Sequence, residues 1–167
     1  MKLSIKRLLA YWIDFVILAV VLVSLQGLLY FTTSGYPFND LKEGYEIEIW
    51  VLLSMSLPVW LYFIGCELYF QQTIGKRMLK LRVTKMDGSR INLHQVLIRT
   101  FVRLLPWELT HLIILVPEPW WGIEQPSNLY LIYIPNLLML LYIVVLIATK
   151  GKMGVHDFIV KTRVRGS

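Results

Sequence analysis

The chain is poor in cysteine, and this limits its covalent and metal chemistry. Cys66 is the only cysteine among the 167 residues. A single thiol excludes an intramolecular disulfide and any metal site built from several cysteines. The fold is therefore expected to rely on non-covalent packing alone.

Formal charge is also missing from long stretches. Residues 49–66 and 129–149 contain no Asp, Glu, Lys or Arg, and residues 8–30 contain only Asp14. At about 1.5 Å per helical residue, each stretch is long enough to cross roughly 30 Å of hydrocarbon. With a hydrophobic fraction of 56% and a mean hydropathy of +0.58, the chain is predicted to be an integral membrane protein. The apolar run at residues 8–30 is too long for a cleaved secretory signal, and Asp14 interrupts it.

Motifs for catalysis and cofactor binding are absent as well. The Gly-Lys-Arg at residues 75–77 lacks the earlier glycine and the following Ser or Thr of a phosphate-binding loop. His94, His111 and His156 lie in separate contexts, with no nucleophile motif and no metal-ligand spacing beside them. We therefore expect no enzymatic activity, no cofactor and no bound metal.

The alternation of apolar and polar segments predicts an all-α membrane fold, a small four-helix bundle, in one domain spanning residues 1–167. Helices are expected at about residues 6–31, 47–70, 93–116 and 129–149. The third is amphipathic and kinked at Pro106, because proline cannot donate a backbone hydrogen bond. Asp87-Gly88 between two short alternating runs predicts a small cytoplasmic β-hairpin over about residues 80–93.

Two topologies are open, because residues 93–116 either cross the membrane or lie on its surface. With four crossings, every Lys and Arg except Lys42 falls on one side. The opposite side then carries a set of carboxylates: Asp40, Glu43, Glu46, Glu48, Glu118 and Glu124. The positive-inside rule makes this the expected topology, with both termini cytoplasmic in a bacterial inner membrane. With three crossings, the basic tail would lie outside.

The high sequence pI of about 9.5 also reflects membrane orientation and does not indicate nucleic-acid binding. In a membrane protein, basic residues mainly report orientation. They also attract anionic lipid head groups, so the bilayer is the expected partner and nucleic acid is not.

Charged residues within or near the apolar segments are costly unless they find partners. We expect a set from different helices to share a polar pocket facing the cytoplasm: Arg7, Asp14, Glu67, Arg99 and Arg103. Two interpretations are open. The pocket holds a cation or proton, or the charges form buried ion pairs that fix helix packing.

Glu108 and His111 lie three residues apart, so they are neighbours on one helix. Imidazole titrates near neutral pH, and the pair is therefore a candidate proton relay. The alternative is an interfacial polar pair just beyond the Pro106 break.

Three stretches in order resemble the RDD family of bacterial membrane proteins: residues 6–14 (KRLLAYWID), residues 72–83 (QTIGKRMLKLRV) with Asp87-Gly88 and Arg99, and residues 154–157 (GVHD) with 162–164 (TRV). The resemblance implies roles for Arg7, Asp14 and Asp157, the last matching the family's second aspartate. It also places residues 162–164 where they can add a strand to the hairpin. Residues 107–111 and 117–128 lie outside the shared pattern.

The resemblance implies transport of unidentified ligands, with Na⁺(Li⁺,K⁺)/H⁺ antiport suggested for some members and accessory roles for others. Two functions therefore remain as hypotheses. One is transport of a cation, a proton or a small ligand. The other is an accessory or regulatory subunit, which binds another membrane protein or a second copy of itself.

Overall fold

The computed structural model describes residues 2–124 and 126–166, and within them four helices are long and apolar enough to cross a membrane. The first is α1 (Leu3–Thr32), and the second joins α2 (Gly44–Val51) to α3 (Leu57–Gly65), with π-helical turns at Leu52–Ser56 and Cys66–Phe70. The third is α5 (Leu93–Leu115), and the fourth is α6 (Tyr133–Ala148), which follows a 3-10 turn at Leu129–Ile132. The expected helical membrane fold is confirmed.

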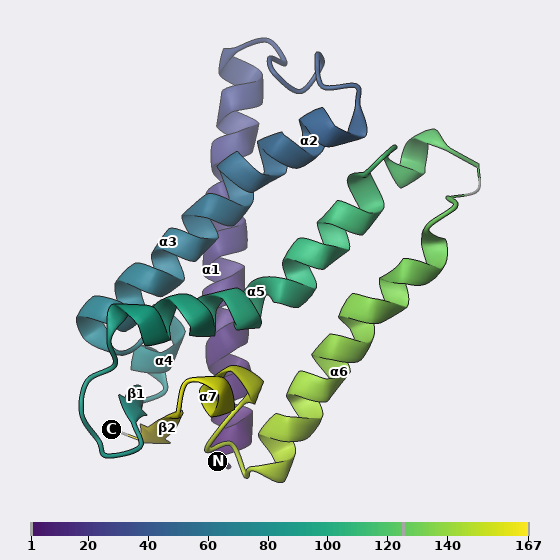
Figure 1. Cartoon of the computed structure of the whole chain (residues 1–167). Coiled ribbons are helices and arrows are strands. Elements are labelled where there is room, and N and C mark those ends of the chain that lie inside the picture. The colour runs from purple at the N-terminus through teal and green to yellow at the C-terminus, as the bar shows by residue number, and fades with distance from the viewer. Residues whose placement is uncertain (1, 125, 167) are drawn as a thin grey trace.

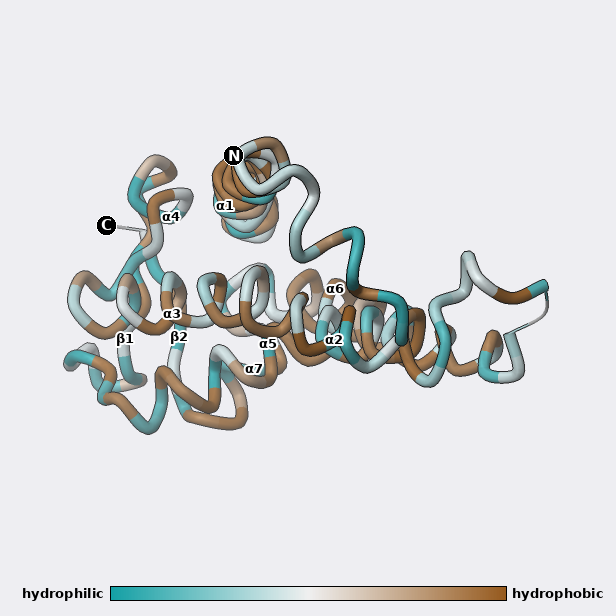
Figure 2. Tube along the Cα trace, turned by 90° about the horizontal axis from the view of Figure 1, so that it is seen from above, coloured by the Kyte–Doolittle hydropathy of each residue, from teal (hydrophilic) through white to brown (hydrophobic). Residues whose placement is uncertain are grey.

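The helices form two layers. Figures 1 and 2 show α1 on one side of a layer that contains α2, α3, α5 and α6. Both chain ends lie at one end of the molecule, together with α4 (Ile74–Met78), α7 (Val155–Ile159) and the strands (Figure 1). We call this the terminal end. The opposite, loop end carries residues 33–43, 116–124 and 126–128, including a 3-10 turn at Trp120–Gly122.

The two strands at the terminal end correct the expected hairpin. β1 (Leu81–Lys85) pairs antiparallel with β2 (Thr162–Gly166), with Val83 opposite Val164. Residues 89–93 form no strand, so the hairpin over 80–93 is wrong, although the tail does join the strand at Leu81–Lys85. The small sheet therefore connects the middle of the chain to its end.

The tight turn at Asp87-Gly88 does form, and the reason for the missing second strand lies just after it. Gly88 has a φ of +92° and its N–H donates to the Lys85 carbonyl at 3.0 Å. Asn92 then caps α5 in a reciprocal pair with Gln95. Only three residues separate Gly88 from this cap, which is too short a segment to pair along β1.

Helix α5 changes direction partway along its length, as expected for a helix with Pro106 in its interior (Figure 1). Proline has no N–H, so the Val102 carbonyl, four residues earlier, has no helical donor. The Tyr142 hydroxyl of α6 donates to that carbonyl at 2.5 Å. The break in α5 is thus satisfied by the neighbouring helix.

Close packing is concentrated at the terminal end. Its buried apolar cluster contains Ala10, Leu81, Val83, Ile91, Val96 and Val164. Helix α4 approaches α1 so closely that a Cβ on Gly75 would lie 2.1 Å from the Ala10 carbonyl oxygen. Elsewhere the long helices expose large apolar side chains, as surfaces that face lipid do.

Candidate functional site

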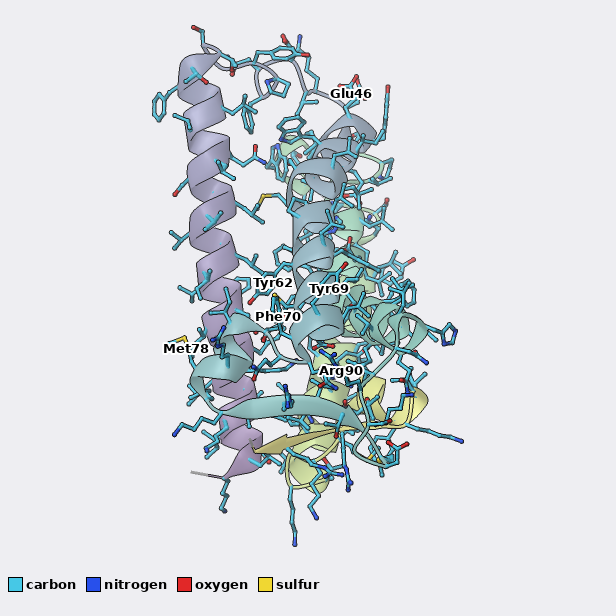
Figure 3. All side chains as sticks on the ribbon, turned by 90° about the vertical axis from the view of Figure 1, so that its left-hand side faces the viewer. Glu46, Tyr62, Tyr69, Phe70, Met78 and Arg90 are labelled. Atoms are coloured by element: carbon cyan, nitrogen blue, oxygen red, sulfur yellow. The ribbon has the colours of Figure 1, made fainter. Side chains whose placement is uncertain are left out.

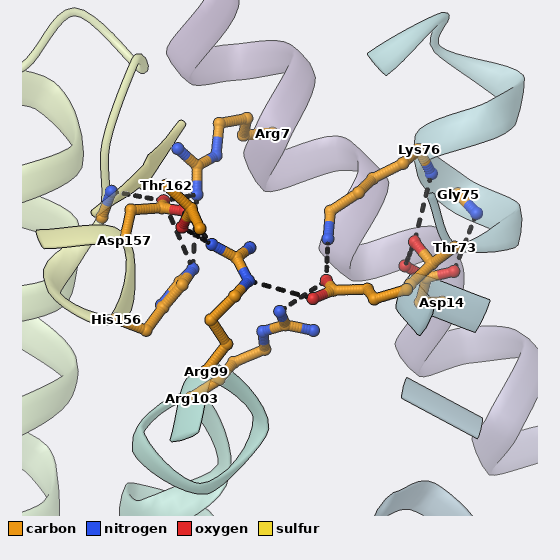
Figure 4. Close-up of polar contacts among 12 residues, drawn as sticks. Arg7, Asp14, Thr73, Gly75, Lys76, Arg99, Arg103, His156, Asp157 and Thr162 are labelled. Carbon is orange, nitrogen blue, oxygen red and sulfur yellow. Dashed lines mark hydrogen bonds and ion pairs between the residues drawn. The ribbon is translucent and has the colours of Figure 1, made fainter. Parts of the chain in front are cut away.

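Arg99 is the centre of a buried ion network at the terminal end (Figure 4). Its side chain is completely buried, and its Nε donates to Glu67 at 3.1 Å. Its Nη1 contacts both Asp157 and Thr162. Arg99 therefore joins a carboxylate of the second long helix to a carboxylate of α7.

Three further cations surround these two carboxylates. Arg7 contacts Asp157 at 2.7 Å, while Lys76 and Arg103 contact the same oxygen of Glu67 at 2.5 and 2.6 Å. We call the six residues the ion network: Arg7, Glu67, Lys76, Arg99, Arg103 and Asp157. They come from α1, the second long helix, α4, α5 and α7, so the network connects five elements.

Local structure explains how each group points inward. Glu67 lies in the π-helical turn that ends the second long helix, and Arg99 and Arg103 are four residues apart on α5. Asp157 lies in the first turn of α7, where its Oδ2 accepts from the Gly154 N–H at 2.7 Å. Arg7 also donates to the Gly151 carbonyl at 3.1 Å, which fixes the start of α1 against the end of α6.

The network perturbs the titration of its members outside the helices that can span the membrane. Burial alone would raise the pKa of Asp157, but the positive charges of Arg99 and Arg7 hold it well below its ordinary value. Burial lowers the pKa of Lys76 to about 8 despite the attraction of Glu67. Burial, with help from the nearby arginines, holds the pKa of His156 well below its ordinary value, so its ring is neutral.

Asp14 is not part of this network. Its carboxylate accepts hydrogen bonds from the Tyr62 hydroxyl at 2.6 Å, the Thr73 hydroxyl at 2.5 Å and the Gly75 N–H at 2.7 Å. None of the described Lys and Arg side chains forms an ion pair with it. The structure thus brings Arg7, Glu67, Arg99 and Arg103 together and adds Asp157, but it assigns Asp14 to neutral donors on and near α4.

A second, partly buried polar group lies where α2 and the following helix pack against α5. His111 Nδ1 is 2.8 Å from Glu48, and His111 Nε2 is 3.0 Å from Glu108. Ser56 and the Trp60 indole also contact Glu108, at 3.1 and 2.8 Å. We call these five residues the histidine cluster: Glu48, Ser56, Trp60, Glu108 and His111.

The arrangement of this cluster restricts its protonation. A neutral imidazole has one donor and one acceptor nitrogen, yet both nitrogens of His111 face carboxylate oxygens. The cluster is therefore either an imidazolium between two carboxylates or a neutral ring beside one protonated carboxyl. In both forms His111 links Glu48 to Glu108 through its two ring nitrogens.

Sequence reasoning missed several residues of both sites. Glu48 was expected among the loop-end carboxylates, but α2 begins at Gly44 and buries Glu48 to 6% exposure. The signal was available: Glu43 and Glu46 form a capping box, which starts the helix at Gly44 and places Glu48 in its second turn instead of at its first residues. Lys76 gave no such signal, because the left-handed residue Gln71 breaks any helical spacing between it and Glu67.

In the parts of the chain that the structure describes, no three His, Cys, Asp or Glu side chains are grouped so that they could hold a metal ion. The Gly75 N–H and the Lys76 amine, which superficially suggest a phosphate loop, contact the carboxylates of Asp14 and Glu67. The chemistry available at the two sites is therefore ion pairing and proton exchange.

Comparison with known proteins gives one match. The family model described as RDD family matches residues 4–161, which is nearly the whole chain. All six residues of the ion network and all five of the histidine cluster lie in that range. No curated protein and no solved structure matches.

Proposed function

The chain belongs to the RDD family of membrane proteins, and from this premise we propose that it is a transport-type protein that exchanges a proton at the histidine cluster. The observation that carries the proposal is the position of His111 between two carboxylates, inside two helices that are long and apolar enough to span a membrane. Ionisable groups within such helices are costly and are typical of proton and ion pathways.

The ion network supports a proton more than a metal cation as the exchanged species. Its carboxylates, Glu67 and Asp157, are already paired with four cations, and Asp14 accepts three hydrogen bonds. A metal cation would have to displace these donors. At the histidine cluster, by contrast, a proton can be gained or lost without displacing any side chain.

The proposal includes an orientation and makes the protein non-enzymatic. Every Lys and Arg except Lys42 belongs to the terminal end or to the segments entering it, so we assign that end to the cytoplasm of a bacterial inner membrane. The histidine cluster then lies toward the exterior. His111 is not available as a catalytic base for an external substrate, because carboxylates occupy both ring nitrogens.

The test is proton movement in proteoliposomes that enclose a pH-sensitive dye, driven by Na⁺ or K⁺ gradients. His111→Gln and Glu48→Gln are expected to slow proton movement about 100-fold, the lower end of what a proton-transferring side chain contributes. Glu118→Gln, an exposed carboxyl of the loop end, is the matched control and should retain the wild-type rate. Wild-type rates in folded His111→Gln would eliminate the proposal.

A second candidate is an accessory subunit, favoured by how little of each long helix the chain itself covers. In the most apolar stretches of the four helices, only 17, 11, 28 and 11% of residues are buried. Trp121 at the loop end is 71% exposed and adjoins a hollow of about 450 Å³ beside Trp50.

Mass spectrometry of the protein released from mild detergent tests whether it is an accessory subunit. A companion protein lost on Trp121→Ala supports it, and a monomer without companions counts against it.

A further inference from the structure

The ion network carries more positive than negative charge. Four cations, Arg7, Lys76, Arg99 and Arg103, surround two carboxylates, Glu67 and Asp157. The side chains of the four cations are between 0 and 11% exposed. Uncompensated charge of this kind is expensive to bury, because the lost hydration is not replaced.

Two guanidinium nitrogens in the network also lack partners. Arg99 Nη2 and Arg103 Nη1 are buried and have no hydrogen-bond partner among the described residues. Buried donors are nearly always satisfied in folded proteins, and a charged donor left unsatisfied is especially costly. Asp14 does not compensate them, since its oxygens accept from Tyr62, Thr73 and Gly75.

Figure 4 shows the side chains of Arg99 and Arg103 side by side, with Lys76 reaching toward them. Glu67 Oε1 lies between Lys76 and Arg103, because it accepts from both side chains at 2.5 and 2.6 Å. From this excess charge and these orphaned donors, we propose that the network binds a phosphate-type oxyanion at Arg99 Nη2 and Arg103 Nη1, the two guanidinium nitrogens that Glu67 and Asp157 leave unpaired, with the Lys76 ammonium adding positive charge nearby. Guanidinium forks match the oxygens of phosphate in geometry, and a lysine ammonium adds a point charge.

The exposure of the cations indicates the route by which the anion enters. The Arg99 side chain is fully buried, whereas the Lys76 and Arg103 side chains are 11 and 7% exposed. Exposed apolar side chains lie on the same segment: Tyr69 and Phe70 precede α4, and Met78 ends it (Figure 3). Such side chains are typical of the lipid head-group level, so both a lipid phosphate and a free phosphate have access.

The test measures thermal unfolding of the delipidated full-length protein in a neutral detergent. One series adds inorganic phosphate, and a matched series adds chloride at equal ionic strength. A third adds micelles doped with phosphatidylglycerol or, as a comparison, with an uncharged diglyceride. A saturable rise in the unfolding temperature with inorganic phosphate identifies a soluble oxyanion. A rise with phosphatidylglycerol alone identifies a lipid head group.

Variants separate the site from general charge screening. Arg103→Gln is expected to weaken phosphate or phosphatidylglycerol binding about tenfold or more, the loss of one charge-assisted hydrogen bond. Arg82→Gln, an exposed arginine on β1, should bind like the wild type. If Arg103→Gln does not fold, Lys76→Met is measured in its place. Equal rises with chloride and phosphate, no rise with either probe, or unchanged affinity in the variant would overturn the proposal.

Discussion

Individual buried charges contribute to this structure mainly by specifying which elements meet. An ion pair in a low-dielectric interior gains little net stability over apolar packing, but removing one partner leaves the other charge uncompensated. Asp157 illustrates this, because it contacts both Arg7 of α1 and Arg99 of α5. The short helix that carries it is thereby attached to two membrane helices.

Replacing Asp157 with asparagine should therefore be strongly destabilising. Arg7 would lose its carboxylate and Arg99 one of its two, and we expect the free energy of unfolding to fall by about 3–5 kcal/mol. Unfolding in mixed detergent micelles measures the change. Asp40→Asn, in an exposed loop, should alter the free energy by no more than about 0.5 kcal/mol. An equal fall in the free energy of unfolding of the two variants would show that the ion pairs of Asp157 do not stabilise the fold.

Lys76 should make stability depend on alkaline pH in phosphate-free buffer. Its pKa is about 8 in the folded protein and has the ordinary value of 10.5 in the unfolded chain. Between these values only the unfolded chain holds the proton. Removing protons from solution therefore disfavours the unfolded chain, and the free energy of unfolding rises with pH over this range because of Lys76. Below pH 8 both states are protonated, and this contribution is constant.

The comparison of wild type with Lys76→Met isolates the effect of this amine from that of other titrating groups. The difference in unfolding free energy between the two proteins should change between about pH 8 and 10.5. It should be flat between pH 6 and about 7. A difference that stays constant across both ranges would mean that the buried amine keeps its ordinary pKa.

At the scale of the elements, the break in α5 depends on α6. Pro106 leaves the Val102 carbonyl without a helical donor, and the Tyr142 hydroxyl takes that position. The bend thus becomes part of the contact between two helices. It also separates the part of α5 that carries Arg99 and Arg103 from the part that carries Glu108 and His111.

A double-mutant cycle tests this coupling. Tyr142→Phe should cost about 1 kcal/mol in the wild-type background, the usual net value of one hydrogen bond. In the Pro106→Ala background it should cost much less, because the restored N–H at position 106 can donate to Val102. Unfolding of the four proteins in mixed micelles gives the coupling energy. Additive losses would mean that the tyrosine does not compensate for the proline.

For the whole molecule, both chain ends lie together with the sheet, α4 and α7 (Figure 1). Pairing of β1 with β2 and of Arg7 with Asp157 joins the beginning, middle and end of the chain. The terminal end also holds the buried apolar cluster. The long helices extend from it and present apolar surface to their surroundings.

The proposed orientation predicts which positions react with a membrane-impermeant thiol reagent in intact cells. In a Cys66→Ser background, Glu124→Cys at the loop end should be labelled. Ser89→Cys, in the turn after β1, should be labelled only after the membrane is permeabilised, because the proposed orientation puts the basic terminal end in the cytoplasm. Labelling of Ser89→Cys in intact cells would reverse the orientation. It would also place the ion network at the exterior.

The sequence by itself determined the four long helices, the Pro106 break and the Asp87-Gly88 turn. Each depends on hydropathy, length or backbone chemistry within a short segment, which is independent of distant residues. It also indicated which charged residues needed partners, because an unpaired charge near hydrocarbon is costly wherever it occurs.

Only the tertiary structure decided which partner each group received. Asp14 accepts from Thr73 and Gly75 because α4 folds back onto α1, a contact that no spacing in the sequence reports. β1 pairs with β2 near the end of the chain because the cap of α5 at Asn92 removes the nearer strand. Pairing between remote segments depends on how helices are placed in space, and local periodicity carries no information about that placement.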